Sequence, residues 1–161
     1  MKKIIFIVSA LIVFTAFNYG IYQKEEIRAN GEIMFLELMP DDPRSLLQGD
    51  YMQLHYAIES IKNSDPLTEK SKYIVVAIDQ NKVGKFGRFY KGEALVANEK
   101  LLHYHNNYGN IRIRPNSFMF QEGQSQHYQH AKYGVFKFDR KGNYILIGLA
   151  DNNLQVIQVK L

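Results

Sequence analysis

Histidines are the residues of this chain whose spacing most directly suggests chemistry, because imidazole nitrogens bind transition metals. His103 and His105 are two residues apart and would share one face of a strand. His127 and His130 are three residues apart, which is about one turn of a helix. Neither pair has a carboxylate placed obviously beside it, and glutamines surround the second pair. We interpret all four as surface histidines and expect no cofactor; a histidine-based metal-binding module is an alternative function.

A polar corner that contains a proline is the second candidate. Pro43 fixes its own φ, and Gly49 can adopt the positive φ that a sharp bend into the next strand needs. Asp42 and Asp50 can accept hydrogen bonds, and Arg44 offers a planar fork to a carboxylate. We interpret these groups as a clip that holds a strand entrance together. The functional alternative is a recognition surface, since loops carried by a rigid sheet often form sites.

Ser45, in the same corner, is the candidate nucleophile. The segment from Ser45 to Asp50 is similar to part of the corner in signal peptidases, whose catalytic serine is activated by a lysine. The spacing between the serine and the glycine differs, however. Counted back from Gly49 by the spacing in signal peptidases, the catalytic serine would fall at Asp41, and Ser45 would take a non-catalytic position. No lysine stands at a spacing that marks it as the base. A serine–lysine hydrolase is therefore the alternative, and the chain is more simply interpreted as a non-enzyme.

Composition excludes several classes of site. The chain has no cysteine, which rules out a thiol nucleophile, a thiolate metal site and a lipoprotein lipobox. Its net charge is +4, and without Lys2 and Lys3 it is 4 − 2 = +2. So mild a charge does not predict nucleic-acid binding. Four cations could form a basic stripe on the outer face of a sheet, either as a solvated face or against anionic headgroups. Its residues would be Lys85, Arg88, Arg112 and Arg114.

The N-terminus predicts a membrane segment. Lys2 and Lys3 precede an apolar run from Ile4 to Phe17. As a helix, residues 4–22 would measure about 28 Å, close to a hydrocarbon core of about 30 Å. This length and composition predict a helix that can span a bilayer.

We predict that residues 1–23 remain attached as a signal anchor and that residues 24–30 form a charged connector. Cleavage by a signal peptidase needs small residues one and three positions before the cut, and Asn18 occupies one of these places in each candidate site. A cleaved signal peptide is the alternative. The N-terminal lysines favour a cytoplasmic N-terminus, which places the rest of the chain outside the cytoplasmic membrane.

Residues 31–161 are predicted to form one mainly β domain, an antiparallel barrel or sandwich with one short helix at residues 124–131. Short apolar runs alternate with turn signals, and the pattern lacks parallel βαβ units. About nine strands are predicted, at residues 32–38, 51–58, 73–79, 83–90, 101–104, 111–115, 133–139, 144–151 and 154–161.

The strand that follows the polar corner alternates between two faces. Its inward face is predicted to carry Met52, Leu54, Tyr56 and Ile58, and its outward face Tyr51, Gln53 and His55. Here the chain reads Gly-Asp-Tyr-x-x-Leu-x-Tyr, from Gly49 and Asp50 through Tyr51 and Leu54 to Tyr56. It resembles the GDYXXLXY family of bacterial proteins, which is named for that string.

Further blocks in the same order extend the resemblance from Gly31 to the end of the chain. They are the Pro-x-Asp-Pro-Arg-Ser lead, Phe118–Gly123 with Tyr128 and Ala131, Tyr133-Gly134-x-Phe136 and Gly148-Leu149-x-Asp151. The resemblance implies one membrane helix or signal before the domain, and genes that often neighbour multi-pass membrane proteins. The function predicted is an accessory or interaction domain, anchored in the bacterial inner membrane and exposed outside the cytoplasm, with an integral membrane protein as a partner.

Overall fold

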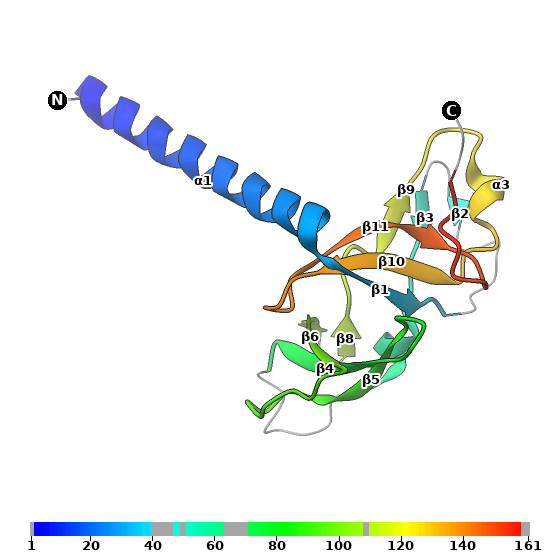
Figure 1. Cartoon of the computed structure of the whole chain (residues 1–161). Coiled ribbons are helices and arrows are strands. Elements are labelled where there is room, and N and C mark those ends of the chain that lie inside the picture. The colour runs from blue at the N-terminus through cyan, green and yellow to red at the C-terminus, as the bar shows by residue number, and fades with distance from the viewer. Residues whose placement is uncertain (1, 40–46, 49–50, 63–70, 108–109, 159–161) are drawn as a thin grey trace.

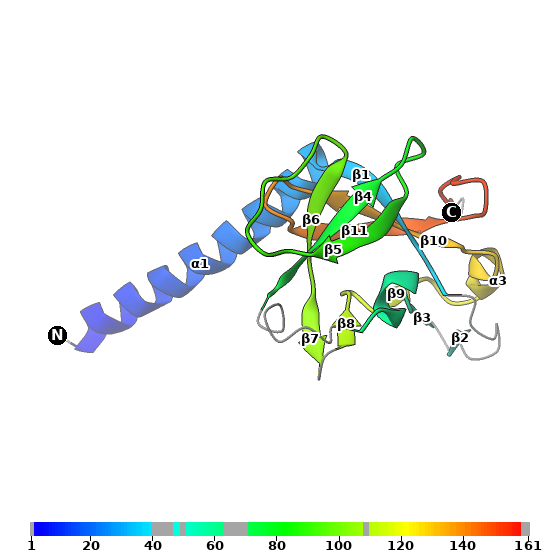
Figure 2. The same ribbon diagram turned by 90° about the horizontal axis from the view of Figure 1, so that it is seen from below.

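The structure is a computed structural model that describes residues 2–39, 47–48, 51–62, 71–107 and 110–158. A long helix, α1 (Lys2–Asn30), projects from one end of a body of short sheets (Figures 1 and 2). The helix includes the predicted membrane segment and continues through residues 24–30, so the predicted connector is helical. It ends where Asn30 and Gly31 signal a turn.

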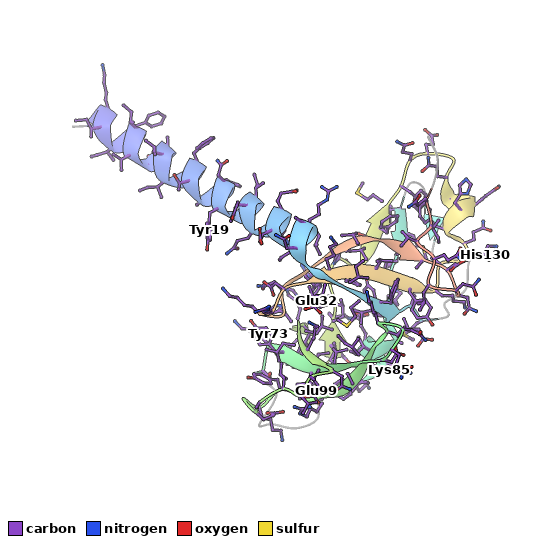
Figure 3. All side chains as sticks on the ribbon, in the orientation of Figure 1. Tyr19, Glu32, Tyr73, Lys85, Glu99 and His130 are labelled. Atoms are coloured by element: carbon purple, nitrogen blue, oxygen red, sulfur yellow. The ribbon has the colours of Figure 1, made fainter. Side chains whose placement is uncertain are left out.

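The surface of α1 is exposed and apolar. Figure 3 shows Tyr19, on this helix, well away from the body. The described side chains from residue 3 to residue 26 are exposed, and only Ile27 near the C-terminal end is buried. By length and composition, α1 could cross a membrane, a property that it shares with signal sequences.

The junction between α1 and the body is short and held by hydrogen bonds. Gly31 alone separates α1 from strand β1 (Glu32–Glu37), and its N–H donates to the carbonyl of Ile27 at 2.8 Å. The Nζ of Lys137 donates to the carbonyls of Arg28 and Ala29. An ammonium on these last carbonyls also meets the negative end of the helix dipole. The helix is therefore coupled directly to the sheet.

Two antiparallel sheets of three strands form the larger part of the body. In one, β10 (Tyr133–Phe138) lies between β1 and β11 (Tyr144–Ala150). In the other, β4 (Tyr73–Ile78) lies between β5 (Gly84–Phe89) and β6 (Glu99–His103). Figure 1 shows the first sheet above the second, like the layers of a sandwich. The described strands do not close into a barrel.

Smaller strands complete the body. A third sheet has the order β2 (Leu47–Gln48), β3 (Tyr51–Gln53) and β9 (Ser117–Met119). Strand β7 (His105–Asn107) pairs with β8 (Asn110–Arg112). The mainly β prediction is confirmed, although β2, β7 and β9 were not predicted as separate strands. Each has only two or three residues, too few for a periodic pattern to show.

The main core lies between the sheets. Met34 and Leu36 of β1 pack in one buried cluster with residues of β4, β8 and β10. Phe35, on the opposite face of β1, joins a second cluster with Val83 and Val135. Ile33, on the same face of β1 as Phe35, is 39% exposed. Because neighbouring side chains of a strand alternate, the burial of Met34 and Leu36 in the main core places Ile33 on the other face of β1. Ile33 is not part of the second cluster there.

Three segments differ from their predicted structure. The chain after β3 keeps its alternating burial but turns into a 3-10 helix, η1 (Ala57–Ser60). The predicted helix at residues 124–131 is reduced to α3 (Ser125–Tyr128), which lacks a side-chain hydrogen bond at its N-cap. The described part of the last predicted strand, residues 154–158, forms only an isolated bridge. Here Asp151 accepts hydrogen bonds from two backbone N–H groups of a turn, which interrupts an extended conformation.

Candidate functional site

Much of the predicted polar corner lies outside the described residues. These residues are Asp42, Pro43, Arg44, Ser45, Gly49 and Asp50. The clip, the recognition surface and the serine nucleophile therefore stay predictions. The neighbouring part of the chain, from Tyr51 onward, is described and leads to a polar pocket.

The pocket lies where the segment after β3 meets the segment around β8. Its volume is about 310 Å³, and polar side chains dominate its lining. The lining residues are Gln53, Leu54, His55, Arg112, Ile113, Arg114 and Asn116. Burial alternates along residues 111–114, since Ile111 and Ile113 are fully buried while both arginines are exposed. That alternation brings the two arginines to the pocket.

Core side chains hold the backbone of the pocket wall. The N–H of Ile113 donates to Oε1 of Glu59 at 2.7 Å, and the N–H of Arg114 donates to the hydroxyl oxygen of Tyr144 at 3.4 Å. The Tyr56 hydroxyl donates to the carbonyl of Pro115 at 2.9 Å. The backbone of residues 113–115, which includes two residues of the wall, is thus held by hydrogen bonds from inside the domain.

The two tyrosines remain neutral at ordinary pH. Burial raises the pKa of Tyr56 above its usual range, and it raises the pKa of Tyr144 to about 12. Desolvation disfavours the charged phenolate in both cases. Each hydroxyl group can therefore keep its place in the hydrogen-bond network.

Glu59 is the one buried acid of this network among the described residues, and sequence reasoning missed it. Its side chain is only 5% exposed, and its Oε2 accepts a hydrogen bond from Nη1 of Arg112 at 3.2 Å. In the sequence, Glu59 begins a mostly polar stretch that carries no sign of a buried acid. Its partners Arg112 and Ile113 are more than fifty residues away, so no local pattern could reveal the pairing.

The basic stripe is not formed as expected. Lys85 and Arg88 lie on β5, which belongs to a different sheet from β8. Arg88 bonds to Glu93 at 2.7 Å and also to Glu99. The pKa of Glu93 is lowered by its own backbone N–H and then by Arg88, and the pKa of Glu99 is lowered chiefly by Arg88. Lys85 is 3.8 Å from a carboxylate oxygen of Asp79. Both cations of β5 are therefore already paired.

The two histidine pairs occupy separate parts of the body. The rings of His103 and His105 are 5.3 Å apart, and His103 also contacts Tyr73 edge-on. His127 and His130 lie in and just after α3, and Figure 3 shows His130 far from Tyr73. Burial, followed by the neighbouring His105, lowers the pKa of His103. The described residues include no group of three or more His, Cys, Asp or Glu side chains that could hold a metal ion.

Comparison with known proteins finds one family whose model covers most of the chain. A sequence model of the GDYXXLXY protein family matches residues 13–149. The chain belongs to the GDYXXLXY family. Neither the curated proteins nor the solved structures contain a match. The resemblance inferred from the sequence is thus confirmed, and the family brings no assigned reaction with it.

The described part of the GDYXXLXY motif divides into an exposed and a buried half. Tyr51 is 41% exposed on β3, opposite Met119 of β9. Leu54 and Tyr56 are buried in the main core, and the Tyr56 ring packs 5.5 Å from that of Phe136. Leu54 also donates its N–H to the carbonyl of Asn116 at 2.8 Å. The second half of the GDYXXLXY motif therefore supports the pocket wall from behind.

Proposed function

We propose that this GDYXXLXY protein is an accessory or interaction domain anchored in the bacterial cytoplasmic membrane, exposed outside the cytoplasm and working beside an integral membrane partner. The observation that carries the proposal is α1, an exposed apolar helix that runs into β1 with one intervening residue. So much exposed apolar surface is unfavourable in water and favourable in lipid.

The dimensions of α1 support a domain held close to the bilayer. Its 29 residues would measure roughly 43 Å, of which residues 4–22 take about 28 Å, close to one hydrocarbon core. The remaining eight residues after Tyr22 add about 12 Å and carry charged side chains such as Glu25 and Arg28. The lysines at the other end favour a cytoplasmic N-terminus. The body then stands just outside the headgroups.

Photocrosslinking in native membranes tests whether a membrane partner exists. A photoreactive amino acid replaces Val13 in α1 or Met119 in β9, which is 79% exposed. The full-length variants are irradiated in cells, and membranes dissolved in detergent before irradiation serve as the control. We expect one defined adduct with an integral membrane protein, lost in the control. Adducts with soluble proteins alone, or none at either position, would count against the proposal.

A further inference from the structure

We propose that the polar pocket binds a phosphate group through the guanidinium of Arg114. This inference goes beyond the proposed function, which assigns no ligand to the domain. It rests on the charge, the donor groups and the rigidity of the pocket. Each of these comes from residues outside the predicted polar corner.

The pocket carries a surplus of positive charge among the described residues. Arg112 and Arg114 both line it, and Glu59 is the carboxylate paired with Arg112. Because the Glu59 side chain is only 5% exposed, its carboxylate is buried among protein atoms and is not exposed to solvent. Arg114 is exposed and has no carboxylate partner in the described part of the chain. One guanidinium is therefore left with an uncompensated charge.

The donor groups suit a phosphate. A guanidinium presents N–H groups in a planar fork that can bond two oxygens of one phosphate at once. The side chains of Gln53 and Asn116, which also line the pocket, carry amide N–H₂ donors. A volume of about 310 Å³ accommodates a phosphate together with a small attached group.

The rigid backbone of the pocket wall favours phosphate binding by Arg114. The backbone of residues 113–115 is fixed by Glu59, Tyr144 and Tyr56. The start of the Arg114 side chain is thus positioned before any ligand arrives. Preorganisation of this kind lowers the entropy lost on binding.

The phosphate could belong to an anionic phospholipid headgroup or to a small soluble molecule. Both would offer the same oxygens to Arg114. The full-length protein in nanodiscs distinguishes them, with inorganic phosphate as the soluble probe and phosphatidylglycerol as the lipid probe. Nanodiscs of a phosphate-free galactolipid at matched ionic strength, with chloride in place of phosphate, are the reference. Hydrogen exchange of residues 111–116 reports occupancy of the pocket.

Arg114→Gln is the test variant, and Arg140→Gln is the matched control. Arg140 is exposed in the turn between β10 and β11, so the control removes the same charge away from the pocket. Arg114→Lys keeps the charge but removes the fork. Thermal unfolding of each variant without phosphate verifies that the fold is intact, which we expect because both arginines are exposed.

The wild-type protein and Arg140→Gln should show slower exchange at residues 111–116 with one of the probes. Arg114→Gln should need at least about tenfold more of that probe, and Arg114→Lys should fall between them. Protection by inorganic phosphate would identify a soluble ligand, and protection by phosphatidylglycerol alone would identify a headgroup. The proposal is overturned if neither probe slows exchange, or if Arg114→Gln and Arg140→Gln respond alike.

Discussion

Replacing Tyr56 with alanine is expected to lower the free energy of unfolding by about 3–5 kcal/mol, because it removes a large aromatic ring from the main core. Tyr56 is fully buried, contacts the ring of Phe136 and bonds to the carbonyl of Pro115. The substitution leaves a cavity beside Phe136 and frees the pocket wall. Denaturant unfolding of the full-length protein in detergent measures the change.

Two further substitutions separate the contributions of ring and hydroxyl. Tyr56→Phe keeps the ring and should cost only about 1 kcal/mol, the usual net value of one hydrogen bond. Tyr51→Ala changes the other tyrosine of the GDYXXLXY motif, which is 41% exposed, and should cost well under half of the Tyr56→Ala effect. Equal losses for Tyr51→Ala and Tyr56→Ala would show that the two tyrosines do not divide their roles as described.

Gly84→Ala is expected to cost about 2 kcal/mol through overpacking between the two main sheets. A Cβ at this position would lie 2.5 Å from Sδ of Met34, 2.8 Å from Cγ1 of Val76 and 3.2 Å from Cδ2 of Leu36. Since all three side chains belong to the main core, the clash can be relieved only by moving β5 away from β1 or by shifting the core. Thermal unfolding in detergent measures the loss.

Gly148→Ala is the matched control for Gly84→Ala. Its Cβ would meet only Cγ1 of Val156, at an ordinary distance of 3.5 Å. We expect a change within about 0.5 kcal/mol at this position. If Gly84→Ala is as well tolerated as Gly148→Ala, the close packing of β5 on β1 is wrong.

Much of the fold could be predicted from local patterns. The segments that became β4, β5, β10 and β11 are long enough for their apolar residues and turn signals to mark them. The inward placement of Leu54 and Tyr56 follows from the alternation of their strand and is confirmed. Gly84, in contrast, leaves room for Met34 and Leu36 of β1. That contact joins strands far apart in the sequence, so no local pattern reveals it.

The candidate site was harder to predict than the fold. Arg112 and Arg114 are predicted to face outward as part of a basic stripe. The pocket, however, depends on Glu59 and Tyr144, which bond across 30 or more residues. Neither stands out in the sequence, because one lies in a polar stretch and the other begins an apolar strand. Long-range hydrogen bonds of this kind arise from the packing of the sheets and cannot be inferred from spacing.

The central claim is that α1 anchors the domain in the membrane and that the domain lies outside the cytoplasm. Labelling of an introduced cysteine tests this claim most directly, because the chain has no cysteine of its own. Lys3→Cys marks the N-terminus, and Gln126→Cys marks the exposed surface of α3. Each full-length variant is exposed to a membrane-impermeant maleimide before or after cell lysis, and membranes are then washed with carbonate. We expect both variants to stay in the membrane pellet. Gln126→Cys should be labelled in intact cells whose outer membrane or cell wall lets the maleimide pass. Lys3→Cys should be labelled only after lysis. Recovery of the protein in the soluble fraction, or labelling of Gln126→Cys only after lysis, would contradict an anchored domain outside the cytoplasm.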